Sequence, residues 1–166
     1  MKSKWASGIK PHNFVWIFQG SLAVCERPGG VREVHRKVRR TEELIWIKRE
    51  GFTRIVSLLV SPHNLTAYGE LSLYYSHIPL LSSGDVSETL TVLYTRLDRW
   101  LSAKEKVLLH QEEVSDRVMG VVAGYLLWSK KIKDAPEATV VIERIVGRPM
   151  GFRGRELVAM MSDVIA

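Results

Sequence analysis

Apolar and polar positions along this chain form blocks that predict strands and helices in turn. Short apolar runs with little polar alternation predict strands that are buried on both faces. Longer segments repeat apolar residues at helical spacing, or begin at a residue such as Thr41, Ser87 or Asp134 that can cap a helix. The expected strands are 14–18, 21–24, 54–60, 73–78 and 107–109, and the expected helices are 41–49, 87–101, 118–128, one from 134, and 156–165. This order predicts one α/β domain over residues 1–166, with a central, mainly parallel sheet flanked by helices in three layers.

The segment after residue 109 is the first candidate site. A strand, a short polar loop and the start of a helix form an arrangement that binds phosphate in many proteins, because the backbone N–H groups at the helix N-terminus are free. The helix 118–128 is apolar nearly all round, which predicts a central, buried position. The candidate phosphate loop consists of Gln111, Glu112, Glu113, Val114, Ser115, Asp116 and Arg117.

This loop resembles the phosphate-binding loop of cysteine-dependent phosphatases, which reads His-Cys, five residues, Arg, and then Ser or Thr. His110 and Arg117 occupy the matching positions, and Gln111 stands where that family has its nucleophilic cysteine. Other segments resemble the same family in the same order: 12–16 and 20–23, 51–58, His77-Ile78-Pro79, and Arg148-Pro149. Over about residues 12–160 the chain is therefore similar to small archaeal-type dual-specificity and protein tyrosine phosphatases. The resemblance implies that His110 orients the loop through a hydrogen bond.

The resemblance also implies chemistry that this sequence does not support. In the family the cysteine attacks as a thiolate, and an aspartate after the Ile-Pro corner protonates the leaving oxygen. An amide such as Gln111 cannot attack phosphorus, and Leu80 and Ser82 stand where the acid would be. Asp85 is either a displaced acid or an ordinary turn residue after Ser83 and Gly84. We therefore expect no intact catalytic set.

Three further positions of the loop and helix depart from the family pattern. Val114 replaces a glycine, Val118 replaces the hydroxyl that helps to expel the thiolate, and Met119 replaces another glycine. A β-branched residue such as Val114 resists positive φ. These joint changes favour a natural loss of the chemistry, although Gln111 alone would also fit an engineered substitution.

The charges of the loop oppose a phosphate dianion. Glu112, Glu113 and Asp116 each repel it by roughly 1–4 kcal/mol at ~4–6 Å, for an effective dielectric of about 20 to 80. Arg117 either binds the anion through two hydrogen bonds or is neutralised by Glu113 or Asp116. The sequence leaves these two interpretations of Arg117 open.

A second candidate is the basic segment 27–40, which resembles an insertion between the opening hairpin and the first helix. Its basic patch consists of Arg32, Arg36, Lys37, Arg39 and Arg40, and Glu33 is its only acid. Such a segment is either a solvated extension or a binding surface for nucleic acid or an acidic partner. Nucleic acid is not favoured, because no aromatic residues interleave with the basic ones.

Composition adds few constraints. The single cysteine, Cys25, rules out an internal disulfide, and the histidines show no metal-ligand spacing, so neither a metal nor another cofactor is expected. No apolar run is long enough to span a membrane, and Met1–Trp5 lacks the apolar core of a signal peptide, which indicates the cytoplasm. The net charge of +6 favours anionic partners, a phosphoprotein among them.

The interpretation best supported by the sequence is a pseudophosphatase, a phosphatase-like protein that acts by binding or regulation. The alternatives are a phosphatase with an engineered or residual site, and a binding module that uses residues 27–40.

Overall fold

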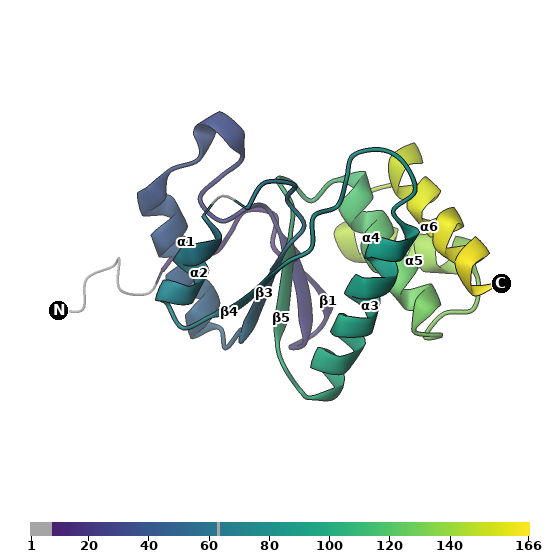
Figure 1. The fold of residues 1–166 in the computed structure, drawn as a ribbon, viewed down its shortest axis with the longest axis horizontal. Coiled ribbons are helices and arrows are strands. Elements are labelled where there is room, and N and C mark those ends of the chain that lie inside the picture. Colours follow the sequence, from purple (N-terminus) through teal and green to yellow (C-terminus); the bar gives the residue numbers. More distant parts are fainter. Residues whose placement is uncertain (1–7, 63) are drawn as a thin grey trace.

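The computed structural model describes residues 8–62 and 64–166, which fold around a five-stranded sheet (Figure 1). The strands are β1 (Val15–Phe18), β2 (Leu22–Cys25), β3 (Arg54–Ser57), β4 (Tyr74–His77) and β5 (Val107–His110). Their order in the sheet is β1-β2-β5-β3-β4. Only β1 and β2 pair antiparallel; the other neighbours are parallel. The predicted mainly parallel α/β sheet is confirmed.

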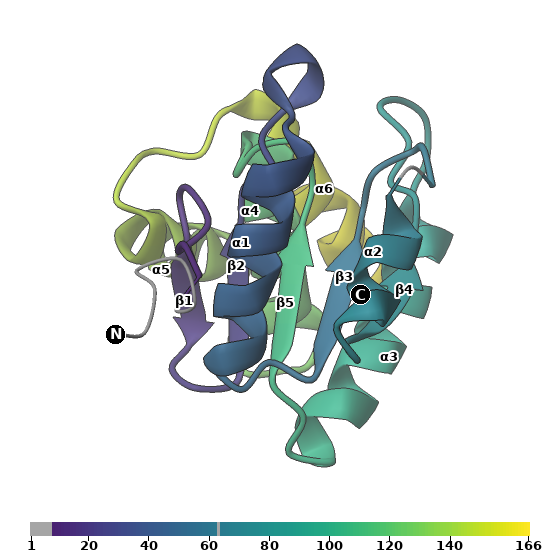
Figure 2. The same cartoon turned by 90° about the vertical axis from the view of Figure 1, so that its left-hand side faces the viewer.

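Helices cover both faces of this sheet. On one face lie α1 (Lys37–Arg49) and α2 (Leu65–Glu70), and on the other lie α3 (Ser87–Ser102), α4 (Asp116–Trp128), α5 (Ala135–Val146) and α6 (Phe152–Ile165) (Figures 1 and 2). The 3-10 turn η2 (Arg32–Val34) projects between β2 and α1 at the top of both views. The three predicted layers are confirmed, whereas α2 was not predicted.

The central strands contribute alternate residues to two hydrophobic clusters. In β2, Leu22 and Val24 belong to the larger cluster under α3–α6, while Ala23 and Cys25 belong to the smaller cluster under α1 and α2. Successive side chains of a strand point to opposite faces, so a strand covered on both sides needs apolar residues at every position. This explains the unbroken apolar runs, and the predicted burial of α4 is confirmed from Val118 to Leu127.

Several predicted boundaries were wrong. Thr41 lies inside α1, where its hydroxyl donates to the Lys37 carbonyl, and the N-cap is Arg36. Ser87 is the first residue of α3, and its N–H donates to the Asp85 carboxylate. By contrast, Asp134 caps α5 as predicted, accepting from Glu137 N at 2.8 Å.

Other elements differ in length from the prediction. Helix α6 begins at residue 152 rather than 156, because its first turn exposes Phe152 and Arg153 and shows no apolar periodicity. Strands β3 and β4 are shorter than the apolar runs that predicted them. No helix of the described ranges 8–62 and 64–166 is both long and apolar enough to cross a bilayer. Met1–Trp5, on which the targeting expectation rests, lie outside the described residues.

Candidate functional site

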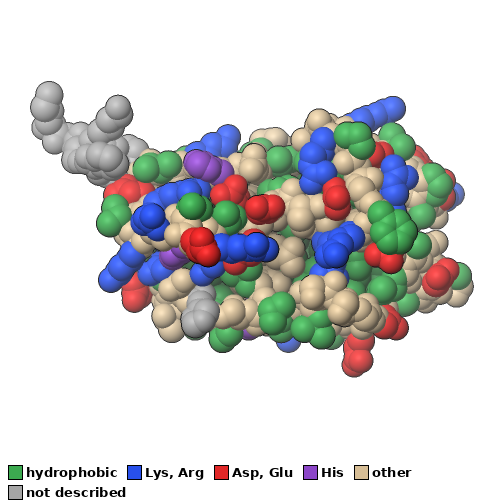
Figure 3. Space-filling view, turned by 90° about the horizontal axis from the view of Figure 1, so that it is seen from above, with side chains coloured by type: hydrophobic (Ala, Val, Ile, Leu, Met, Phe, Trp, Pro, Cys, Tyr) green, Lys and Arg blue, Asp and Glu red, His purple; other side chains and the backbone are tan. Residues whose placement is uncertain are grey.

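The candidate loop lies at the carboxyl edge of the sheet, at its centre. Strand β5 ends at His110, which pairs in register with the last residues of both neighbours, Cys25 and Ser57. The chain then turns through residues 111–115 and enters α4, whose N-terminus carries the positive end of the helix dipole. Figure 3 looks onto this end of the molecule and shows Lys and Arg side chains in separate groups with acidic side chains among them.

The backbone of the loop offers hydrogen-bond donors. Within the described part of the chain, the N–H groups from Glu113 to Arg117 have no protein acceptor. Ser115 caps α4, and its hydroxyl accepts from Val118 N at 3.3 Å. Val114 does not adopt positive φ, and its side chain packs against the larger core cluster. The loop therefore accommodates Val114 without the conformation that a glycine would permit.

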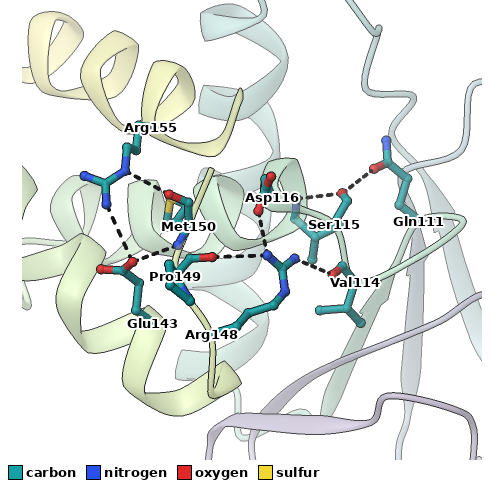
Figure 4. A network of polar contacts seen from close by, with 10 residues as sticks. Gln111, Val114, Ser115, Asp116, Glu143, Arg148, Pro149, Met150 and Arg155 are labelled. Carbon is teal, nitrogen blue, oxygen red and sulfur yellow. Dashed lines mark hydrogen bonds and ion pairs between the residues drawn. The ribbon is translucent and has the colours of Figure 1, made fainter. Parts of the chain in front are cut away.

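Gln111 lies at the nucleophile position of the loop. Its side-chain oxygen accepts from the Ser115 hydroxyl at 3.4 Å, so the amide is turned toward the helix start (Figure 4). The Gln111 side chain is half-buried and lines a cavity over the loop. It contributes a hydrogen-bonding amide to this cavity and no nucleophile.

Two of the three loop carboxylates are engaged by arginines from distant parts of the chain. Glu112 forms an ion pair with Arg27 at 3.1 Å and also accepts from Arg32 N at 3.0 Å. Asp116 forms an ion pair with Arg148 at 2.6 Å, and Arg148 also donates to the Val114 carbonyl (Figure 4). Their negative charges are therefore partly neutralised before any ligand binds.

Asp116 also links the N-terminus of α4 to that of α6. The pKa of Asp116 lies below its usual range. The largest cause is the hydrogen bond from the Arg148 guanidinium, and a hydrogen bond from the backbone of Gly151 adds to it. A side chain at Gly151, the N-cap of α6, would collide with the Asp116 carboxylate. The carboxylate is thus ionised and fixes the start of α6 beside the loop.

Arg117 has a different environment from the one expected for an ion pair. Among the described residues, no carboxylate lies within 4.0 Å of its guanidinium. Partial burial and then the neighbouring charge of Arg153 lower the pKa of Arg117, while Glu156 opposes this shift. Asp116 pairs with Arg148 instead, and Glu113 is exposed. The ion-pair interpretation of Arg117 is therefore not supported, and two like charges face the same cavity.

His110 is buried beneath the loop. Its Nδ1 lies 3.1 Å from the Gln111 carbonyl and its Nε2 lies 2.8 Å from the Tyr68 hydroxyl. A carbonyl only accepts, so Nδ1 carries the proton and Nε2 accepts from Tyr68. Burial lowers the pKa of His110 to about 4, so the ring is neutral at pH 7. This geometry holds the first peptide of the loop.

Asp85 is not assembled with the loop. Its carboxylate accepts from Ser87 N at 2.9 Å, and this hydrogen bonding lowers the pKa of an exposed group. It lines a separate depression with His77, Pro79 and Arg96. Of the two positions where the family acid was expected, Ser82 lines the loop cavity and Leu80 is buried.

The cavity over the loop measures about 540 Å³. Residues far apart in sequence build its walls: Arg27 and Arg32 from the basic segment, Leu59 to Ser61 after β3, and Arg153 from the first turn of α6. Sequence reasoning had not placed Arg27, Arg32 or Arg153 here, because no local pattern connects them to residue 111. Four arginines and three carboxylates line the cavity, with two of the carboxylates paired.

The basic patch is divided between two environments. Arg39, in α1, contacts the fully buried Glu43 at 2.5 Å and lies 3.7 Å from Glu26. Arg32, Arg36 and Lys37 are exposed. The segment is therefore anchored to the body of the protein at Arg39 and exposed at Arg32, Arg36 and Lys37. Within residues 8–62 and 64–166 no cluster of three potential metal ligands occurs.

Comparison with known proteins finds relatives through structure alone. No family model matches the sequence, and no curated protein matches it. The phosphatase Tk-PTP in its active form superimposes with a TM-score of 0.71 at 20% identity, covering 91% of this chain and 97% of that chain. Kinase associated phosphatase, with its catalytic cysteine substituted by serine, gives 0.76 at 18% identity and covers 94% and 97%.

A third similar structure is the human tyrosine phosphatase-like serine/threonine/tyrosine-interacting protein. It gives a TM-score of 0.66 at 13% identity and covers 92% of this chain and 95% of that chain. Each of the three superpositions covers nearly the whole length of this chain and of the compared chain. The chain has the fold of the small dual-specificity and protein tyrosine phosphatases.

Proposed function

We propose that this chain is a cytoplasmic pseudophosphatase, which binds an anionic group of a partner in the loop cavity and does not hydrolyse it. The observation that carries the proposal is Gln111 at the nucleophile position, hydrogen-bonded to Ser115. The position of Asp85 in another depression adds support, because a hydrolase needs an acid within reach of the leaving oxygen.

Binding is supported by what remains of the phosphate loop. Unpartnered N–H groups, a helix N-terminus and the half-buried Arg117 together favour an anion. Arg117 and Arg153 repel each other, so an anion between them would relieve an unfavourable interaction. The pairing of Glu112 and Asp116 weakens the repulsion expected from the loop sequence and leaves the exposed Glu113 as its main source.

The alternatives have less support. A residual phosphatase that uses Asp85 would need that carboxylate to leave its hydrogen bond with Ser87 and reach the loop. An engineered Gln111 would not explain why Val118 belongs to the larger core cluster and Val114 packs against it. One structural neighbour is by its name phosphatase-like and interacting, which is compatible with a binding role on this fold.

The first experiment measures hydrolysis of para-nitrophenyl phosphate and of a phosphotyrosine peptide by the purified chain. We expect no turnover above buffer. A rate within two orders of magnitude of an ordinary kcat of ~1–10 s⁻¹ would contradict the proposal.

The second experiment measures binding of inorganic phosphate by calorimetry. Arg117→Gln should weaken binding by about tenfold or more, since a charge-assisted hydrogen bond contributes ~1.5–3 kcal/mol. Arg144→Gln, an exposed arginine on α5, is the matched control and should bind like the unmodified protein. Equal affinity of the Arg117 variant would remove the loop from the binding role.

A further inference from the structure

A protrusion between β2 and α1 presents an unusual mixture of side chains. We use "basic protrusion" for residues 31–38, which include η2 and project above the loop end of the sheet (Figures 1 and 2). Arg32, Arg36 and Lys37 are exposed there, with Glu33 as the only acid of the protrusion. Val34 is 55% exposed and Val38 is 73% exposed. The protrusion therefore exposes two valines and three cations to solvent.

The basic protrusion is held in a defined conformation. Its base is fixed by Arg36 N, which donates to the Gly29 carbonyl at 2.8 Å, and by Gly29 N, which donates to the buried Glu43 at 3.1 Å. The Arg36 guanidinium donates to the carbonyls of Glu33 and His35, each at 3.0 Å. A surface ordered in this way loses less conformational entropy on binding than a flexible loop would lose.

The protrusion is also tied to the phosphate loop. Glu112 accepts from Arg32 N and pairs with Arg27, and the Glu112 carbonyl accepts from Arg27 N at 3.1 Å. Arg32 adopts φ of +40°, a conformation that non-glycine residues rarely hold without a reason. Here it directs the Arg32 N–H to the Glu112 carboxylate. Through Glu112, the basic protrusion is therefore joined to the loop that lines the cavity.

The chemistry of the surface selects one class of partner. Three cations favour an acidic ligand through charge complementarity. The exposed valines favour aliphatic side chains on that ligand, because apolar contact needs an apolar counterpart. Nucleic acid satisfies the first condition only, since single strands bind through aromatic stacking and this protrusion contains no aromatic residue.

We propose that the basic protrusion docks an acidic protein segment that carries aliphatic side chains, and that Glu112 couples this docking to the phosphate loop. Arg32 also lines the loop cavity, whereas Arg36, Lys37 and the two valines lie outside its lining. The docking proposal rests on these exposed side chains and needs no anion in the loop.

The test uses the full chain and three labelled probes of equal length in fluorescence anisotropy at 0.15 M salt. The probes are a peptide of repeated Glu-Glu-Leu units, an oligoglutamate and a single-stranded oligodeoxynucleotide. We expect the Glu-Glu-Leu peptide to bind most tightly. Val34→Ser with Val38→Ser should weaken its binding by about fivefold or more and change oligoglutamate binding little. Tightest binding of the oligonucleotide, or no effect of the valine substitutions, would overturn the proposal.

Two controls keep the result interpretable. Val140→Ser with Val164→Ser removes two exposed valines from α5 and α6 and should leave peptide affinity unchanged. For the coupling, backbone NMR should show shifts of the Glu112 to Ser115 amides when the peptide binds, and Glu112→Gln should diminish these shifts. Unmoved loop amides in the unmodified protein would refute the coupling.

Discussion

The chemistry of the site is decided by single residues whose environments do not favour hydrolysis. Gln111 hydrogen-bonds Ser115, and Val118, which follows the loop arginine, is buried and offers no hydroxyl. These identities can be read directly from the sequence. The ion pairs of Glu112 and Asp116 could not be predicted, because their partners are 85 and 32 residues away.

Placing a cysteine at position 111 should not restore phosphatase activity. We expect Gln111→Cys to show little or no turnover of aryl phosphates, because no acid reaches the leaving oxygen and Val118 cannot help to expel the thiolate. A stopped assay with para-nitrophenyl phosphate checks this, and a variant with cysteine at the same position and Val118→Ser serves for comparison. Robust activity of the single substitution would mean that Gln111 alone blocks an otherwise competent site.

Burial of His110 should make stability depend on pH. Its pKa falls from 6.5 in the unfolded chain to about 4 in the folded protein, so unfolding takes up a proton between these values. The stability is fully present above pH 6.5 and is lost as the pH falls toward 4, by about 2 kcal/mol between pH 6.5 and 5. Urea titrations at both pH values measure this loss. His110→Asn should flatten the difference, whereas the exposed His12→Gln should keep it.

At the scale of elements, helix packing controls the orientation of the loop. Gly120 of α4 and Gly154 of α6 meet backbone to backbone, and a Cβ at residue 120 would lie 2.4 Å from the Gly154 carbonyl oxygen. The sequence predicted α4 and its burial correctly from its apolar residues. It did not predict the start of α6, because Phe152 and Arg153 are exposed and Gly151 is positioned by Asp116. Tertiary contacts of this kind leave no local periodicity.

Gly120→Ala should therefore destabilise the protein by about 2–3 kcal/mol, since a methyl group there forces two packed helices apart. Thermal or urea denaturation measures the change. Gly69→Ala is the matched control: this helical glycine of α2 has only a side-chain neighbour at 3.4 Å, and alanine raises helix propensity. A Gly120 variant as stable as the Gly69 variant would show that α4 and α6 separate easily.

At the scale of the whole molecule, the sheet unites the two hydrophobic clusters. Strands β2, β3 and β5 each send alternate residues into both, so neither cluster persists once the strands separate. The alternation of strands and helices predicted this architecture from sequence. That pattern did not place cavity residues such as Arg32 in η2 and Arg153 in the first turn of α6. It defines layers and does not specify which segments meet above the sheet.

We therefore expect one cooperative unfolding transition. Tryptophan fluorescence reports both sides of the sheet, since Trp16 and Trp46 pack against the smaller cluster and Trp100 and Trp128 belong to or pack against the larger. Its urea midpoint should coincide with that of far-UV circular dichroism. Two separated midpoints would indicate that the two layers of helices unfold independently.

The bridge from Glu112 to Arg27 and Arg32 has a consequence for protein engineering. Transplanting a complete phosphatase loop into positions 111–117 would remove the carboxylate that neutralises Arg27 and accepts from Arg32 N. The half-buried Arg27 would then lack its counter-ion, and the positive φ of Arg32 would lose its compensating hydrogen bond. Residues 27–36 would therefore have to be redesigned together with the loop. Any attempt to recover an enzyme from this scaffold has to treat the two segments as one structural unit.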